Sequence, residues 1–245
     1  MNVSSEAEVP QRAPRAAPPA LVALIAPDVG MERQARVGKA GLAFAIALAC
    51  ALFAAFSLVS RIDATSATLR KLEQGGQLTT MSERQIEDET KSAERLFQVK
   101  AVAGGVLDAP VFLLLDGLGV LVLVWFLRGK VKGRAVFPVA AVTLLPGAIA
   151  HALDGITALR QASLPLEGAR LAPHNLADVL AVFGHPLTGA ALKLGNAFDF
   201  FSLWAAVLMA FGVAAAGEVP TRRALIGTFC AWVCLRLITN VAMGG

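Results

Sequence analysis

Residues 194–212 read LGNAFDFFSLWAAVLMAFG, and this stretch sets how the remainder of the chain is interpreted. One carboxylate, Asp199, and a dense group of aromatic side chains open a run that is otherwise apolar. The apolar residues continue to Gly217, so a helix over this run is long enough to cross a hydrocarbon core of about 30 Å. We therefore expect a membrane span over residues 197–217.

The composition extends this expectation to the whole protein. Of its 245 residues 56% are hydrophobic and 16% are charged, a balance more apolar than that of ordinary soluble domains. The net charge is +4, but the Lys and Arg residues stand in short clusters beside apolar runs, where they orient a chain in a bilayer. We accordingly expect membrane lipid as a partner and no nucleic acid.

Apolar runs recur along the chain and predict an all-α, polytopic membrane bundle of five spans. The first run starts too far along the chain for a signal peptide, so we expect it to remain as a span. A sixth span over residues 176–194 is the alternative, but it would place Pro186 inside a helix. The predicted spans cover residues 40–60, 101–127, 135–152, 197–217 and 224–243.

The third of these spans carries two prolines, Pro138 and Pro146, which are expected to kink it. Thr143 lies between them in the sequence. Its hydroxyl group is placed to donate to a backbone carbonyl that the kink leaves without a partner.

Basic residues orient the spans. Four of them crowd the short loop between the second and third spans, which marks that loop as cytoplasmic. The N-terminus is then inside and the C-terminus outside, and we expect a bacterial cytoplasmic (inner) membrane. Eleven Lys and Arg fall on the inner side: Arg12, Arg15, Arg33, Arg36, Lys39, Arg128, Lys130, Lys132, Arg134, Arg222 and Arg223.

The segments outside the spans differ in character. Residues 1–20 are rich in Pro, Ala and charged side chains, which predicts a disordered tail. Residues 21–39 combine a short apolar run with basic residues and predict an interfacial, cytoplasmic flank. Residues 155–195 alternate prolines with short amphipathic pieces, the first of them capped by Asn175, and predict two interfacial helices on the outer side.

Residues 61–100 form the only long charged stretch, with seven basic and seven acidic side chains. Ser82 and Gln85 have the spacing of a capping box at the start of a helix. We therefore expect the first two spans to continue outside the membrane as an antiparallel helical hairpin, with its tip between Gly75 and Thr80. An irregular loop is the alternative.

Two ionisable residues lie deep inside predicted spans. Asp116 is about 16 Å and Arg236 about 19 Å from the inner ends of their helices, from the 1.5 Å rise per residue. An unpaired charge in hydrocarbon is costly, and the two depths match. We expect a buried ion pair between Asp116 and Arg236, with a proton or ion relay as the alternative.

A second polar group gathers at the outer ends of the spans: Asp108, His151, Asp154, His185 and Asp199. Carboxylates and imidazoles bind divalent cations, so a metal site is one interpretation. Polar side chains are nevertheless ordinary at a membrane interface, and Asp199 stands three residues after Asn196, where a carboxylate stabilises the first turn of a helix. We expect a structural role and no metal.

The sequence lacks the common signatures of catalysis and nucleotide binding, such as a Walker A loop, a GxSxG elbow or an HExxH helix. The three cysteines all lie in apolar runs, where they act as small apolar side chains. We therefore expect no catalytic residue and no cofactor.

The opening of the 197–217 run carries a family resemblance. Its motif consists of an aspartate among aromatic residues, a tryptophan one turn later and a glycine near the end: Phe198, Asp199, Phe200, Trp204 and Gly212. Together with the basic turn at residues 221–224, this pattern resembles the bacterial branch of the Yip family of Ypt/Rab-interacting membrane proteins. The resemblance implies a five-span protein with a cytoplasmic N-terminus.

The resemblance also implies a class of function. Its eukaryotic members bind Rab GTPases or shape membranes through a cytoplasmic N-terminal region, of which this chain has only a short tail, so GTPase binding is not carried over. We expect a non-enzymatic membrane scaffold or adaptor that forms homo-oligomers or binds other membrane proteins. A small-solute or ion transporter that uses Asp116 and Arg236 is the first alternative, and a membrane enzyme is the second.

Overall fold

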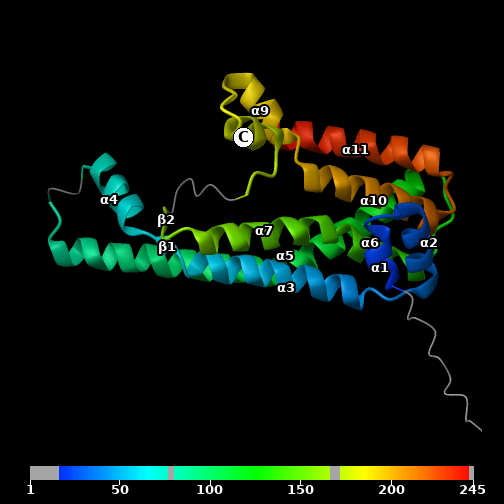
Figure 1. Cartoon of the computed structure of the whole chain (residues 1–245), viewed down its shortest axis with the longest axis horizontal. Coiled ribbons are helices and arrows are strands. Elements are labelled where there is room, and N and C mark those ends of the chain that lie inside the picture. Colours follow the sequence, from blue (N-terminus) through cyan, green and yellow to red (C-terminus); the bar gives the residue numbers. More distant parts are fainter. Residues whose placement is uncertain (1–16, 77–79, 166–171, 243–245) are drawn as a thin grey trace, which may run out of the picture.

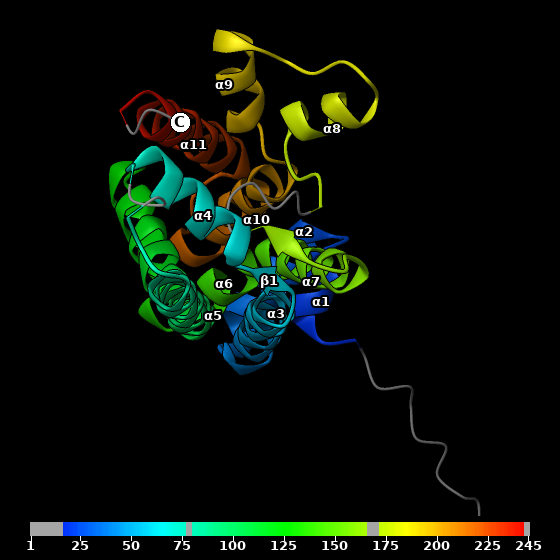
Figure 2. The same cartoon turned by 90° about the vertical axis from the view of Figure 1, so that its left-hand side faces the viewer.

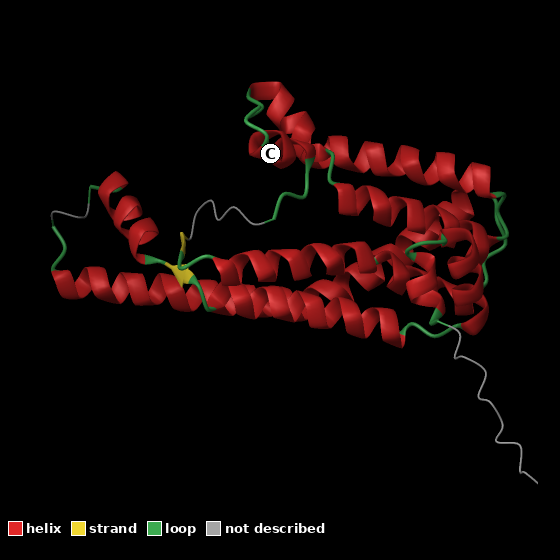
Figure 3. Cartoon of the chain, in the orientation of Figure 1, coloured by secondary structure: helices red, strands yellow, loops and turns green. Residues whose placement is uncertain are grey.

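The computed structural model describes residues 17–76, 80–165 and 172–242, and these are helical almost throughout (Figures 1 and 3). The described strands are two residues each, β1 (Ile62–Asp63) and β2 (Leu164–Pro165), and they pair in parallel. The predicted all-α class is confirmed. The helices are α1 (Pro19–Ala23), α2 (Pro27–Val37), α3 (Gly41–Val59), α4 (Thr65–Gln74), α5 (Glu83–Phe126), α6 (Gly133–Thr143), α7 (Leu145–Arg160), α8 (Leu176–Val182), α9 (Gly189–Ala197), α10 (Phe200–Gly217) and α11 (Thr221–Ala242).

Four helical segments among the described residues are long and apolar enough to cross a membrane: α3, α5, the α6–α7 pair and α10. Their outward faces carry large apolar side chains, as on α5, where Leu114 is 62% exposed. Such a surface is expected against lipid and not against water. The membrane character of the chain is thus supported, while the fifth predicted span, α11, is not among the four and stays a prediction.

Helix α5 is one continuous helix of 44 residues, about 66 Å long at the usual rise. The predicted capping box starts it: Ser82 accepts from the backbone of Gln85, whose side chain accepts from the backbone of Ser82. Its length is about twice the thickness of a bilayer core, so the first part of α5 extends well beyond the apolar part. Helix α4 packs against that extension, and residues 77–79 of the predicted hairpin tip lie outside the described residues.

The N-terminal region differs in one detail from the expectation. Residues 1–16 of the predicted disordered tail lie outside the described residues, and α1 begins at Pro19, inside the range predicted to be disordered. Proline is favoured in the first turn of a helix because it has no N–H to leave without a partner. Helices α1 and α2 pack together, and α2 lies against α6 and α10.

Helix α10 occupies the middle of the bundle and contacts α2, α5, α6, α7 and α11. Small residues allow these close contacts: Gly212 faces Val139 of α6, and Gly217 faces Val124 of α5. Val139 and Val124 are both fully buried in the main core cluster. Seen along the bundle, α11 lies at its edge, on the far side of α10 (Figure 2).

The third span is interrupted beside one of its two prolines, while Pro138 lies inside α6 without ending it. Helix α6 ends at Thr143 and α7 begins at Leu145, with Pro146 in its first turn. Thr143 Oγ1 lies 2.6 Å from the carbonyl of Ala140, the kind of acceptor predicted for it, and also within hydrogen-bond distance of Asp116 Oδ2, so its single hydrogen is shared between two possible acceptors. The α7 helix continues to Arg160, eight residues beyond the predicted end of the span.

The outer connection between α7 and α10 holds two short helices, α8 and α9. Asn175 caps α8 as predicted, because its side chain accepts from the backbone of Asp178. The two helices have seven and nine residues with a break between them, so the alternative of one span over residues 176–194 is wrong.

Candidate functional site

Two His–Asp pairs connect separate elements at the outer end of the bundle. The first joins α5 to α7: His151 Nε2 lies 2.8 Å from Asp108 Oδ2, and both side chains are partly exposed. The second joins α7 to the segment before α8: His174 Nε2 lies 2.6 Å from Asp154 Oδ1. His151 and Asp154 are one helical turn apart, so α7 contributes one residue to each pair.

Asp154 and His174 form the better buried pair, with side chains 14% and 20% exposed. The backbone N–H of Ala172 also donates to Asp154 Oδ1, at 3.2 Å. The imidazole of His174 packs edge-on against Phe201 of α10, with ring centroids 5.5 Å apart. The backbone carbonyl of His174 accepts a hydrogen bond from the backbone N–H of Phe200. His174 therefore fastens the outer connection to both α7 and α10.

His174 was missing from the sequence prediction. Its imidazole Nδ1 is buried and has no hydrogen-bond partner among the described residues, and Nε2 is the ring nitrogen that contacts Asp154. The sequence did mark His174 as a candidate, because it is one of only three histidines in the chain and directly precedes the capping residue Asn175.

Asp199 and His185 do not join these pairs. The prediction that Asp199 is the third residue of a helix capped by Asn196 was wrong, because α9 continues past Asn196 to Ala197. Asp199 is itself the N-cap of α10, and its carboxylate accepts from the backbone of Ser202 at 2.9 Å. His185 lies in the exposed turn after α8. The described residues contain no group of three or more His, Cys, Asp or Glu that could hold a metal ion.

Asp116 is hydrogen-bonded to a residue that was not predicted as its partner. Thr143 Oγ1 of α6 lies 2.5 Å from its carboxylate. An ion pair of Asp116 with Arg236 is not among the ion pairs between described residues. Helix α11 packs mainly against α10, and the pairing of Asp116 with Arg236 stays a prediction. The carbonyl of Arg236 accepts from Thr239 on its own helix.

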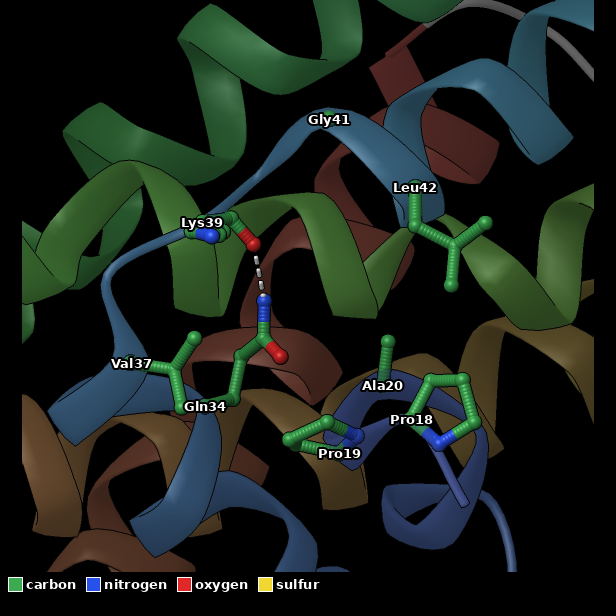
Figure 4. Close-up of a pocket in the computed structure, with 8 residues that line it drawn as sticks. All are labelled: Pro18, Pro19, Ala20, Gln34, Val37, Lys39, Gly41 and Leu42. Atoms are coloured by element: carbon green, nitrogen blue, oxygen red, sulfur yellow. Dashed lines mark hydrogen bonds between the residues drawn. The ribbon is translucent and has the colours of Figure 1, made fainter. Parts of the chain in front are cut away.

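Two open hollows lie at the end of the bundle where α2 meets α6 and α10. The first measures about 470 Å³ and is lined mainly by apolar side chains beside α1 and the start of α3 (Figure 4). Gln34 crosses its base and donates to the carbonyl of Lys39 at 2.6 Å. The second measures about 450 Å³ and is lined by charged and apolar residues of α2, α10, the region where α6 begins and the turn after α10. Neither hollow was predicted.

Comparison of the chain with protein-family models, with curated proteins and with solved structures finds no match in any of the three. The resemblance to the Yip family therefore stays a prediction that rests on the motif itself. In the structure the motif residues have separate positions: Asp199 caps α10, Trp204 packs against the core cluster and Gly212 contacts α6.

Proposed function

We propose that this chain is a five-span integral membrane protein that acts as a non-enzymatic scaffold or adaptor of the Yip type. The observation that carries this proposal is the filled interior of the bundle. Its main core cluster consists of apolar side chains, most of them alanine and valine, contributed by α1, α2, α3, α5, α6, α7, α10 and α11. Helices packed this tightly favour a fixed support for partners over a path for a solute.

Helix α11 serves as the fifth span in this proposal. Its outward face is apolar, with Ile226, Leu235 and Ile238 each more than half exposed. The helix has 22 residues, enough to cross a bilayer core. It runs beside α10 from the basic turn back toward α9 (Figure 1), which agrees with a cytoplasmic N-terminus and an outer C-terminus. The bacterial inner membrane is the proposed location.

Partner contacts are assigned to the outer parts of the chain. The α4–α5 hairpin and the α8–α9 connection project beyond the apolar part of the bundle and expose large apolar side chains. On α5 Val99 is 66% exposed, and beside α8 Phe183 is 73% exposed. Exposed apolar groups outside the lipid-facing zone are typical of surfaces that bind other membrane proteins or a second copy. We propose contacts of this kind, without a GTPase.

Transport is the weaker alternative. Asp116 is hydrogen-bonded to Thr143 of the neighbouring helix, which suits a structural link between α5 and α6. The two hollows described above are lined by residues at one end of the bundle.

Site-specific photocrosslinking in native membranes tests the scaffold proposal. A photoreactive phenylalanine at position 99 or 183 is expected to give discrete protein adducts, since both side chains face outward beyond the membrane zone. The same group at position 114, on the lipid-facing surface of α5, is the matched control and should give lipid adducts only. Absence of protein adducts at positions 99 and 183, combined with ion or solute flux in proteoliposomes that Asp116→Asn abolishes, would favour the transporter instead.

A further inference from the structure

The end of the bundle that holds both hollows carries a concentrated positive charge. Helix α2 and the short link to α3, the loop before α6 with the first turn of α6, and the turn from α10 into the start of α11 all meet there (Figure 1). These segments contain nine basic side chains and only three acidic ones, Asp28, Glu32 and Glu218, an excess of six positive charges. The basic residues, which we call the cationic collar, are Arg33, Arg36, Lys39, Arg128, Lys130, Lys132, Arg134, Arg222 and Arg223, and all nine are exposed.

Internal ion pairs neutralise little of this charge. Glu32 pairs with Arg36 on the same helix, and Glu218 pairs with Lys132 at 3.0 Å. The hydrogen bond from Lys132 lowers the pKa of Glu218, so this carboxylate stays ionised beside its partner. The other seven collar residues have no carboxylate within ion-pair distance in the described part of the chain.

The backbone holds the central part of the collar in place. In the loop before α6, Lys130 and Lys132 donate their backbone N–H groups to the carbonyls of Gly217 and Ala216, each at 2.8 Å. Gly129 lies so close to α10 that a Cβ there would come within 2.5 Å of the Gly217 carbonyl. A loop fixed in this way presents its charges without the ordering cost that a flexible tail would incur.

The collar adjoins a surface suited to lipid. Trp125 and Phe126 end α5 immediately before Arg128 and are 77% and 72% exposed. Aromatic side chains of this kind gather at the level of lipid head groups, and basic residues just beyond them reach the phosphates. Leu42, at the start of α3, is also exposed and lines the first hollow together with Lys39.

We infer that the cationic collar binds the head groups of anionic phospholipids and selects them over zwitterionic ones. The excess positive charge attracts an anionic ligand. The adjacent exposed aromatic residues favour a ligand with acyl chains, because such chains can cover their apolar surface. The balanced charge of residues 61–100, with seven basic and seven acidic side chains, gives no such preference at the other end. The inference depends on the membrane insertion that the proposed function includes.

Quenching of Trp125 by brominated lipids tests this inference. Trp204→Phe and Trp232→Phe leave Trp125 as the only tryptophan, and the full chain is reconstituted in phosphatidylcholine vesicles. Brominated phosphatidylglycerol is expected to associate with the Trp125 region about fivefold more strongly than brominated phosphatidylcholine, as about 1 kcal/mol of interfacial attraction implies. The preference should fall toward one in the collar variant Arg128→Gln, Lys130→Gln, Arg134→Gln, which spares the paired Lys132.

A matched variant removes the same number of charges from the opposite end: Arg84→Gln, Arg95→Gln and Lys100→Gln. It should keep the fivefold preference. Equal quenching by the two lipids, or an unchanged preference in the collar variant, would overturn the inference. If neither lipid quenches Trp125, the chain is not inserted and the proposed function itself fails.

A second measurement covers the case in which the tryptophan substitutions prevent folding. The unmodified chain in neutral detergent should gain thermal stability from short-chain phosphatidylglycerol, and this gain should weaken as salt is raised. Equal effects of phosphatidylglycerol and phosphatidylcholine would contradict anionic selectivity.

Discussion

Replacing Gly212 by valine is expected to prevent stable assembly of the bundle. A Cβ at position 212 would lie 2.1 Å from Cγ1 of Val139, a fully buried side chain on α6. The contact is in the middle of the core, where α10 meets most of the other helices, so little room exists for relaxation. We expect a loss of about 3 kcal/mol or more in unfolding free energy, at the upper end of overpacking effects.

Thermal unfolding in detergent, followed by circular dichroism and size-exclusion chromatography, measures this loss. Gly104→Val is the matched control, because a Cβ at Gly104 on α5 meets nothing within 4 Å. The smaller change Gly212→Ala should be partly rescued by Val139→Ala, which removes the atoms it would meet. Equal stability of the two valine variants would show that α10 and α6 do not pack as described.

Replacing Asp154 by alanine is expected to release the outer connection from α7. Two donors, His174 Nε2 and the backbone N–H of Ala172, lose their acceptor at once. A buried donor without a partner costs about 1–3 kcal/mol, so we expect a destabilisation of that order together with faster amide exchange over residues 172–183.

Hydrogen–deuterium exchange with mass spectrometry measures the release. His174→Ala should also increase exchange, and combining it with Asp154→Ala should add little, since Asp154→Ala already removes the contact between the two side chains. His185→Ala is the control, because His185 is exposed in the turn after α8. Unchanged exchange over residues 172–183 in Asp154→Ala would mean that this pair does not hold the connection.

Local signals predicted a large part of the structure. The capping box at Ser82, the cap at Asn175 and the proline break near Thr143 depend on residues a few positions apart, and each appears as expected. The apolar runs likewise predicted the four long helical segments, because length and composition alone determine whether a helix can cross a bilayer.

What the sequence did not reveal concerns lateral position and helix boundaries. Matching depth suggested Arg236 as the partner of Asp116, and that pairing stays a prediction. Depth does not determine which helices are neighbours, so the hydrogen bond between Asp116 and Thr143 was not foreseen. Asp199 was predicted as the third residue of a helix capped by Asn196, but it is the N-cap of α10. The reason is that α9 extends past Asn196, and no residue nearby in the sequence indicated this. His174 was overlooked because its partner Asp154 lies 20 residues away, across the turn from α7.

Accessibility of the chain end beyond α11 tests the five-span topology most directly. The three native cysteines are replaced by alanine, and single cysteines are introduced as Glu89→Cys on the outer part of α5, Val131→Cys in the collar loop and Gly244→Cys after α11. A membrane-impermeant maleimide applied to intact cells is predicted to label positions 89 and 244 and to leave position 131 unlabelled until the membrane is opened. Labelling of position 131 from outside, or protection of position 244 together with position 131, would contradict five spans with an inner N-terminus.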